Sequence, residues 1–184
     1  MIWNQLIWFF IAFACCASAG SYFVFNRKPT PLKGALAWVF PLAGNVLLLT
    51  FTTILWLQLE RPPMKTMAET RLLYAVFVGI ITWVIFLKTR SRWMYLLGNV
   101  MAMVFLLVDL IHPEYQQKNL MPALQSVWFI PHVVVYMISY AVLAAACLSA
   151  LMGLFRSSFG KNDFRNDLNL AMKLVYPGTA LLTI

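Results

Sequence analysis

Few side chains in this chain have the chemistry to bind a metal ion or to transfer a proton. It contains two histidines, His112 and His132, and three cysteines, Cys15, Cys16 and Cys147. The cysteines lack the paired spacing of a zinc site or of a disulfide framework. We interpret them as small packing residues within apolar segments. The histidines therefore carry the chemical interest of the sequence.

His132 follows Pro131 at the start of the apolar run "PHVVVYMISYA". Proline is favoured at the first position of a helix, which places His132 at the exposed start of a helix over residues 131–155. The positive end of the helix dipole disfavours an imidazolium ion there. A neutral imidazole with a free nitrogen is the form that binds metals. The position thus favours a metal ligand.

Tyr136, Ser139 and Tyr140 follow His132 at spacings that place all four on one helical face, and Trp128 lies just outside that face. The spacing predicts an aromatic and polar stripe along an otherwise aliphatic helix. A second interpretation stays open. Tryptophan and tyrosine gather at membrane interfaces in general, and a Tyr or Ser within a membrane helix often bonds a neighbouring helix.

His112 lies in "IHPEYQ", which is typical of a helix end followed by a proline stop. Asp109, one turn earlier, is the only carboxylate well inside a predicted span, and it too lies near the outer end. Histidines at two depths within helices would indicate an electron-transfer cytochrome, and buried carboxylates along a path would indicate a proton transporter. Neither pattern is present.

The elements that position these residues are predicted to be membrane helices, because 62% of the residues are hydrophobic and 11% are charged. We expect an all-α, multi-pass transmembrane bundle that forms a single membrane domain over residues 1–184. A span needs about 20 apolar residues. Five full spans meet this need, and an incomplete sixth helix begins after Lys173, so we expect the N-terminal part of a longer chain: 2–25, 35–59, 67–87, 93–111, 131–155 and 174–184.

Two further patterns concern the ends of these helices. Thr66 and Glu69 have the spacing of a capping box, which predicts a helix start at Met67. Ten of the fourteen Lys and Arg residues lie in the first, third and fifth loops, which predicts that these loops are cytoplasmic and that the N-terminus and His132 are outside. The formal charge of +8 is then a topology signal, and no nucleic-acid partner is expected.

Two segments resemble a known family. The segment "NLMPALQSVWFIPHVVVYMISYA" (119–141) closely resembles the part of the CcsA/ResC-type cytochrome c assembly proteins that carries their first external histidine. These proteins share a haem-handling module with CcmC. The segment "ERPPMKTMAETRLLYAVF" (60–77) resembles the opening of the preceding helix pair in the branch where CcsA is often fused to CcsB.

The resemblance implies a protein of the bacterial cytoplasmic (inner) membrane that delivers haem b, as cargo, to the external face for covalent attachment to apocytochrome c. It implies a CcsB/ResB-type membrane partner and makes His132 an axial haem ligand. The flat macrocycle would lie against Trp128 and Tyr136. Cations that could meet the haem propionates on the outer side are Arg61, Lys65, Arg71 and Lys118.

The family's tryptophan-rich external loop and its other histidines follow the helix that begins near Leu174, so we expect them beyond the present sequence. The resemblance implies a share in a cytochrome c synthetase complex, and we expect no enzyme activity from this segment alone. Two alternatives remain: a small multi-pass transporter and a non-catalytic membrane assembly subunit. A transporter needs polar residues near mid-membrane on several helices, whereas the candidates here are chiefly Asn45, Thr50 and Thr52.

Overall fold

The computed structural model describes residues 2–25, 31–89, 92–116, 128–158 and 164–183. Every element in this part of the chain is helical, which confirms the predicted all-α class. The elements are the two 3-10 helices η1 (Ile2–Gln5) and η2 (Pro113–Gln116) and the α-helices α1 (Leu6–Phe25), α2 (Pro31–Leu59), α3 (Met67–Thr89), α4 (Arg92–Ile111), α5 (Phe129–Ser158) and α6 (Phe164–Leu182).

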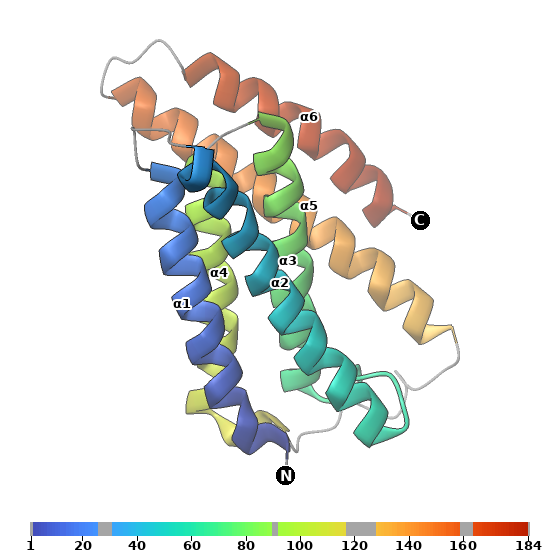
Figure 1. Ribbon diagram of the computed structural model, residues 1–184. Coiled ribbons are helices and arrows are strands. Elements are labelled where there is room, and N and C mark those ends of the chain that lie inside the picture. Colours follow the sequence, from blue (N-terminus) through green and yellow to red (C-terminus); the bar gives the residue numbers. More distant parts are fainter. Residues whose placement is uncertain (1, 26–30, 90–91, 117–127, 159–163, 184) are drawn as a thin grey trace.

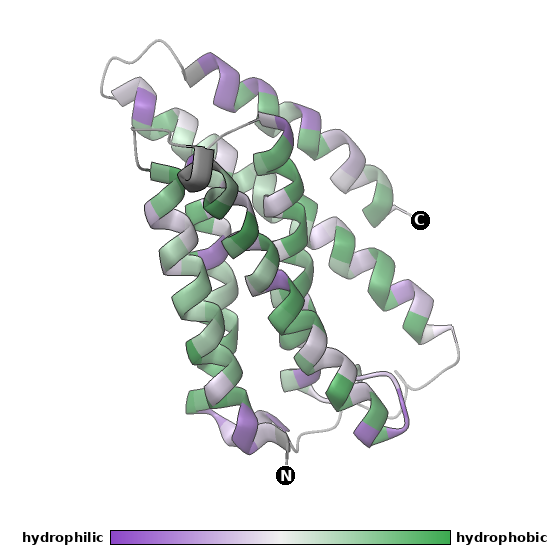
Figure 2. Ribbon diagram, viewed as in Figure 1, coloured by the Kyte–Doolittle hydropathy of each residue, from purple (hydrophilic) through white to green (hydrophobic). Residues whose placement is uncertain are grey.

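Five helices are long and apolar enough to cross a membrane, and the chain is therefore an integral membrane protein. Figure 2 shows hydrophobic residues along most of the helical surface, with hydrophilic residues gathered toward the ends of the bundle and along part of α6. The apolar stretches are Trp3–Phe25, Ala35–Leu59, Met67–Thr89, Arg92–Ile111 and Ile130–Ser158. They agree with the five predicted full spans.

The sixth helix differs most from its prediction. Its start was predicted near Leu174, but α6 begins at Phe164. The predicted start marked only the apolar second half, whereas the helix also includes a polar first half. That half packs on α5, where Leu168 lies against Gly153 and Arg156 forms a 2.8 Å ion pair with Asp167. Tertiary contacts with α5 therefore extend the helix beyond its apolar run.

The helices form a bundle with α3 near its middle. α3 contacts α2, α4 and α5, while α1 packs on α2 and α4, and α5 forms an antiparallel hairpin with α6 at one flank (Figure 1). One end of the bundle collects the N-terminus, the α2–α3 connection, η2 and the start of α5 (Figure 1). The structure thus brings residues 60–66, the segment after α4 and His132 to the same end, as the predicted topology requires.

Close helix contacts in the bundle depend on small residues. Within lipid the hydrophobic effect adds little to helix association, so interfaces rely on close packing of Gly and Ala. Gly98 of α4 lies directly against Thr82 of α3, and Gly79 of α3 lies against the Asn45 side chain of α2. The largest buried cluster takes residues from each of α1, α2, α3 and α4. It contains Leu6, Phe13, Leu48, Phe51, Leu55, Leu72, Ala75, Val76, Ala102 and Leu106.

Candidate functional site

The predicted capping box holds the connection between α2 and α3. The Thr66 Oγ1 accepts the Glu69 N–H at 3.3 Å, and Glu69 Oε2 accepts the Thr66 N–H at 3.2 Å, so the predicted start at Met67 is confirmed. The two guanidinium Nη atoms of Arg61 also donate to the Glu69 carboxylate at 3.0 and 2.9 Å, and the Lys65 N–H donates at 2.6 Å. One buried carboxylate thus fastens the whole connection to α3.

His132 lies one helical turn into α5. The helix begins at Phe129 rather than at the predicted Pro131, so the His132 N–H already donates to the Trp128 carbonyl, at 3.3 Å. Pro131 still falls in the first turn, where a missing N–H breaks no intrahelical bond. The predicted first helical position is therefore wrong for Pro131. The exposed placement of His132 at the helix start agrees with the structure.

The face of α5 that continues from His132 carries an aromatic row. The imidazole centroid lies 4.3 Å from the Tyr136 ring at an interplanar angle of 64°, and the Tyr136 and Tyr140 centroids are 6.0 Å apart. Ser139 departs from the predicted stripe, because it is buried and its hydroxyl donates to the Gly178 carbonyl of α6 at 2.6 Å. The Trp128 side chain is 82% exposed at the end of this row.

Arg71, one of the predicted propionate cations, lies in the second turn of α3. Its Nε–H donates to Asp109 Oδ1 of α4 at 2.7 Å, and the Asp109 side chain is fully buried. The guanidinium also lies 4.4 Å from the centroid of the Tyr115 ring in η2. A signal for this pair was available, since a lone carboxylate in an apolar span calls for a cation at the same depth.

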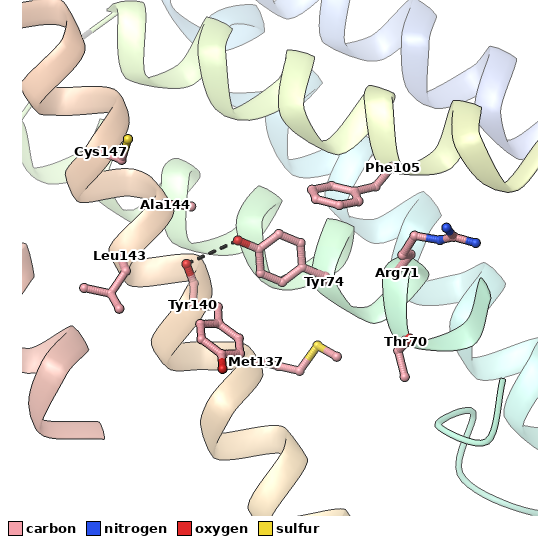
Figure 3. A pocket seen from close by; sticks show the side chains of 9 residues that line it. All are labelled: Thr70, Arg71, Tyr74, Phe105, Met137, Tyr140, Leu143, Ala144 and Cys147. Atoms are coloured by element: carbon pink, nitrogen blue, oxygen red, sulfur yellow. Dashed lines mark hydrogen bonds between the residues drawn. The ribbon is translucent and has the colours of Figure 1, made fainter. Parts of the chain in front are cut away.

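A groove of about 530 Å³ opens between α3, α4 and α5. Figure 3 shows Tyr74 reaching from α3 toward α5, where its hydroxyl donates to the Tyr140 carbonyl at 3.2 Å. Tyr140 belongs both to the aromatic row of His132 and to this groove, so the two features are continuous. The lining is mostly apolar and consists of Thr70, Arg71, Tyr74, Phe105, Met137, Tyr140, Leu143, Ala144 and Cys147.

The predicted propionate cations have different surroundings. Arg61 is paired with Glu69, and Arg71 is paired with Asp109. Lys65 forms no ion pair within the residues that the structure describes. Lys118 lies outside those residues, as do four of the charges used for the topology prediction: Arg27, Lys28, Arg90 and Lys161.

Metal ligation in the described ranges would rest on single side chains, because no group of three or more His, Cys, Asp or Glu residues gathers there. An iron that sits in a macrocycle needs protein ligands only at its axial positions. The exposed imidazole of His132 beside an aromatic row is suited to that task. His112 differs, because its Nδ1 lies 3.0 Å from Glu114 Oε1 and its ring packs on Tyr115.

The fold and the site define a multi-pass helical membrane protein with an exposed histidine at one end of the bundle. Residues 7–184 match the family model described as cytochrome C assembly protein, and the chain belongs to that family. This confirms the resemblance predicted from the segments 60–77 and 119–141.

Two relatives are both named cytochrome c biogenesis protein CcsA. The protein from Marchantia polymorpha is 24% identical over 135 residues, which cover 72% of this chain and 41% of the relative. The protein from Picosynechococcus sp. is 30% identical over 127 residues, which cover 67% of this chain and 38% of the relative. The matches thus span about two fifths of these relatives. No solved structure matches the chain.

Proposed function

We propose that this protein acts in cytochrome c biogenesis and presents haem b at the external face of the bacterial cytoplasmic membrane for covalent attachment to apocytochrome c. It would do so together with a CcsB/ResB-type membrane partner. The observation that carries the proposal is the exposed imidazole of His132, packed on Tyr136 near the start of α5, in a chain of the cytochrome c assembly family.

In this proposal the chain binds and orients haem and leaves the bond-forming chemistry to its reactants. An imidazole nitrogen of His132 would ligate the haem iron. The apolar macrocycle would lie against Trp128 and Tyr136. Thioether bonds would form between the haem vinyl groups and the apocytochrome thiols, and the protein would raise the rate by holding the two together.

The propionates need cations or water at the membrane surface. Arg61 and Arg71 already face carboxylates, so either would have to share its charge with a propionate. Lys65 lies in the same α2–α3 connection as Arg61. Unlike Arg61 and Arg71, it forms no ion pair with another residue that the structure describes. We therefore assign Lys65 as the first candidate for a propionate contact.

The transporter alternative gains no support from the polar residues of α2. The Asn45 amide donates to the Pro41 carbonyl at 3.0 Å, and the Thr50 and Thr52 hydroxyls donate to carbonyls one turn earlier, both at 2.8 Å. These donors serve their own helix, as polar groups within lipid must.

The test is His132→Ala in the complete gene product, purified from cells that express a reporter cytochrome c. Removing a residue that only hydrogen-bonds to a metal ligand already lowers metal affinity about ten-fold or more. Removing the ligand itself should therefore remove most of the bound haem and abolish cytochrome maturation. Added imidazole should partly restore both. His112→Ala is the control and should keep the wild-type absorption spectrum. Full haem content in His132→Ala would refute the assignment.

A further inference from the structure

We infer that Arg71 and Tyr74, on one face of α3, are positioning residues that fix η2 and α5 relative to each other and thereby set the place of His132. The inference rests on the proposed function for its haem readout, but its geometric part can be tested independently. The two residues are three positions apart, so they project from the same side of α3. Neither needs to touch haem in order to act.

Arg71 holds the segment that follows α4. Its guanidinium is bonded to the buried Asp109 and covers the Tyr115 ring, so it contacts both α4 and η2. The Gln116 side-chain amide donates to the Asp109 carbonyl at 3.3 Å, which draws the last residue of η2 to the same place. The segment Pro113–Gln116 is thus tied to one turn of α3.

Tyr74 holds α5 from the next position on that face. Its hydroxyl donates to the Tyr140 carbonyl at 3.2 Å, and its ring packs edge-on against Phe105 of α4 with centroids 4.8 Å apart. Figure 3 shows Arg71 and Tyr74 side by side on α3, with only Tyr74 reaching α5. Tyr140 follows His132 by two helical turns, or about 12 Å along the axis. A shift of α5 at Tyr140 would therefore move His132.

The two contacts bracket the segment that leads to His132. In the sequence, residues 116–139 lie between these two contacts. Arg71 contacts Tyr115 of η2, and Tyr74 contacts Tyr140 of α5. A buried ion pair contributes little net stability compared with well-packed apolar residues, whereas it can specify one arrangement of its elements. The contacts of Arg71 and Asp109 therefore fit a role in specifying how α3, α4 and η2 are arranged.

The geometric test measures the distance between spin labels at Pro113 and Ile130 in the complete protein with its native cysteines replaced. Tyr74→Phe removes one hydroxyl, and Arg71→Met with Asp109→Leu replaces the ion pair by apolar residues. Both variants should shift or broaden the distance distribution. Two matched controls should leave the distance distribution unchanged. One is Tyr22→Phe on α1, and the other is Arg156→Met with Asp167→Leu, an ion pair of similar burial at the opposite end of the bundle.

The functional test measures haem affinity and the absorption spectrum of the same variants without labels. Tyr74→Phe and the Arg71/Asp109 double variant should bind haem about three- to ten-fold more weakly, with a displaced spectrum, while both controls match the wild type. Unchanged distances, or unchanged haem binding in Tyr74→Phe, would overturn the inference. If the double variant does not accumulate, Tyr74→Phe decides. Wild-type haem binding by His132→Ala would instead overturn the proposed function.

Discussion

Glu69 and Asp109 show how this protein accommodates carboxylates near the ends of apolar helices. The Glu69 carboxylate accepts hydrogen bonds from the Arg61 guanidinium and from two backbone N–H groups of the α2–α3 connection. Asp109 relies on Arg71 of a neighbouring helix. Because a buried charge without a partner is costly, both pairings are requirements of the fold as well as features of the site. They differ in range, since the first is local and the second joins two helices.

Glu69→Ala should be strongly destabilising. It removes the cap of α3 and leaves the Arg61 guanidinium and two N–H groups without their acceptor, so we expect a loss of about 3 kcal/mol in the free energy of unfolding. Equilibrium unfolding of the purified protein in detergent measures it. Glu114→Ala is the control, because this carboxylate is 54% exposed and pairs with His112 at the surface, where such pairs contribute less than about 1 kcal/mol. Equal losses in the two variants would contradict the capping role.

At the scale of helices, close approach at glycine decides which pairs can pack. A Cβ on Gly98 would collide with the Thr82 side chain of α3, whereas a Cβ on Gly44 would meet its nearest neighbour, Phe13, at an ordinary 3.4 Å. Alanine substitutions at Gly98 and Gly44 therefore separate the effect of steric overlap from that of helix propensity. The same principle explains why α3 and α4 lie so close beside the site.

Gly98→Ala should lower the stability of the bundle by about 1–3 kcal/mol, because the added methyl group forces α3 and α4 apart. Gly44→Ala should be neutral or slightly stabilising, since alanine has the higher helix propensity. Thermal unfolding in one detergent compares the two variants directly. If Gly98→Ala were as stable as the wild type, the close α3–α4 contact would be wrong.

At the scale of the whole molecule, the bundle has two chemically different ends. One end carries the α2–α3 connection, η2 and the start of α5, and the other carries the ends of α1, α3 and α5 (Figure 1). The uneven distribution of Lys and Arg predicts that the first end is external. In the proposed function, this orientation would allow His132 to meet an apocytochrome outside the cytoplasm.

Single-cysteine labelling tests that orientation. In a background without native cysteines, an impermeant thiol reagent added to intact cells should label a cysteine at Gln116 and spare one at Ser158. The physical reason is that basic loops are retained on the cytoplasmic side. Permeabilised cells supply the control, since both positions should then react. Labelling at 158 alone would reverse the orientation and place His132 in the cytoplasm.

The sequence alone determined the features that depend on local order. Span positions follow from runs of apolar residues, and the α3 start follows from Thr66 and Glu69, because a capping box forms between residues three positions apart. The proximity of Tyr136 to His132 follows from helical periodicity. The start of α6 could not be obtained in this way, because its polar half is helical through contacts with α5.

Only the tertiary structure decided which faces meet. Arg71 and Asp109 are 38 residues apart, Tyr74 and Tyr140 are 66 apart, and Ser139 turns away from His132 to bond α6. Helical periodicity places side chains on a face, but it leaves the rotation of each helix and the choice of its neighbours open. In this bundle those are set by steric fit at small residues and by polar contacts between helices, such as those of Arg71, Tyr74 and Ser139.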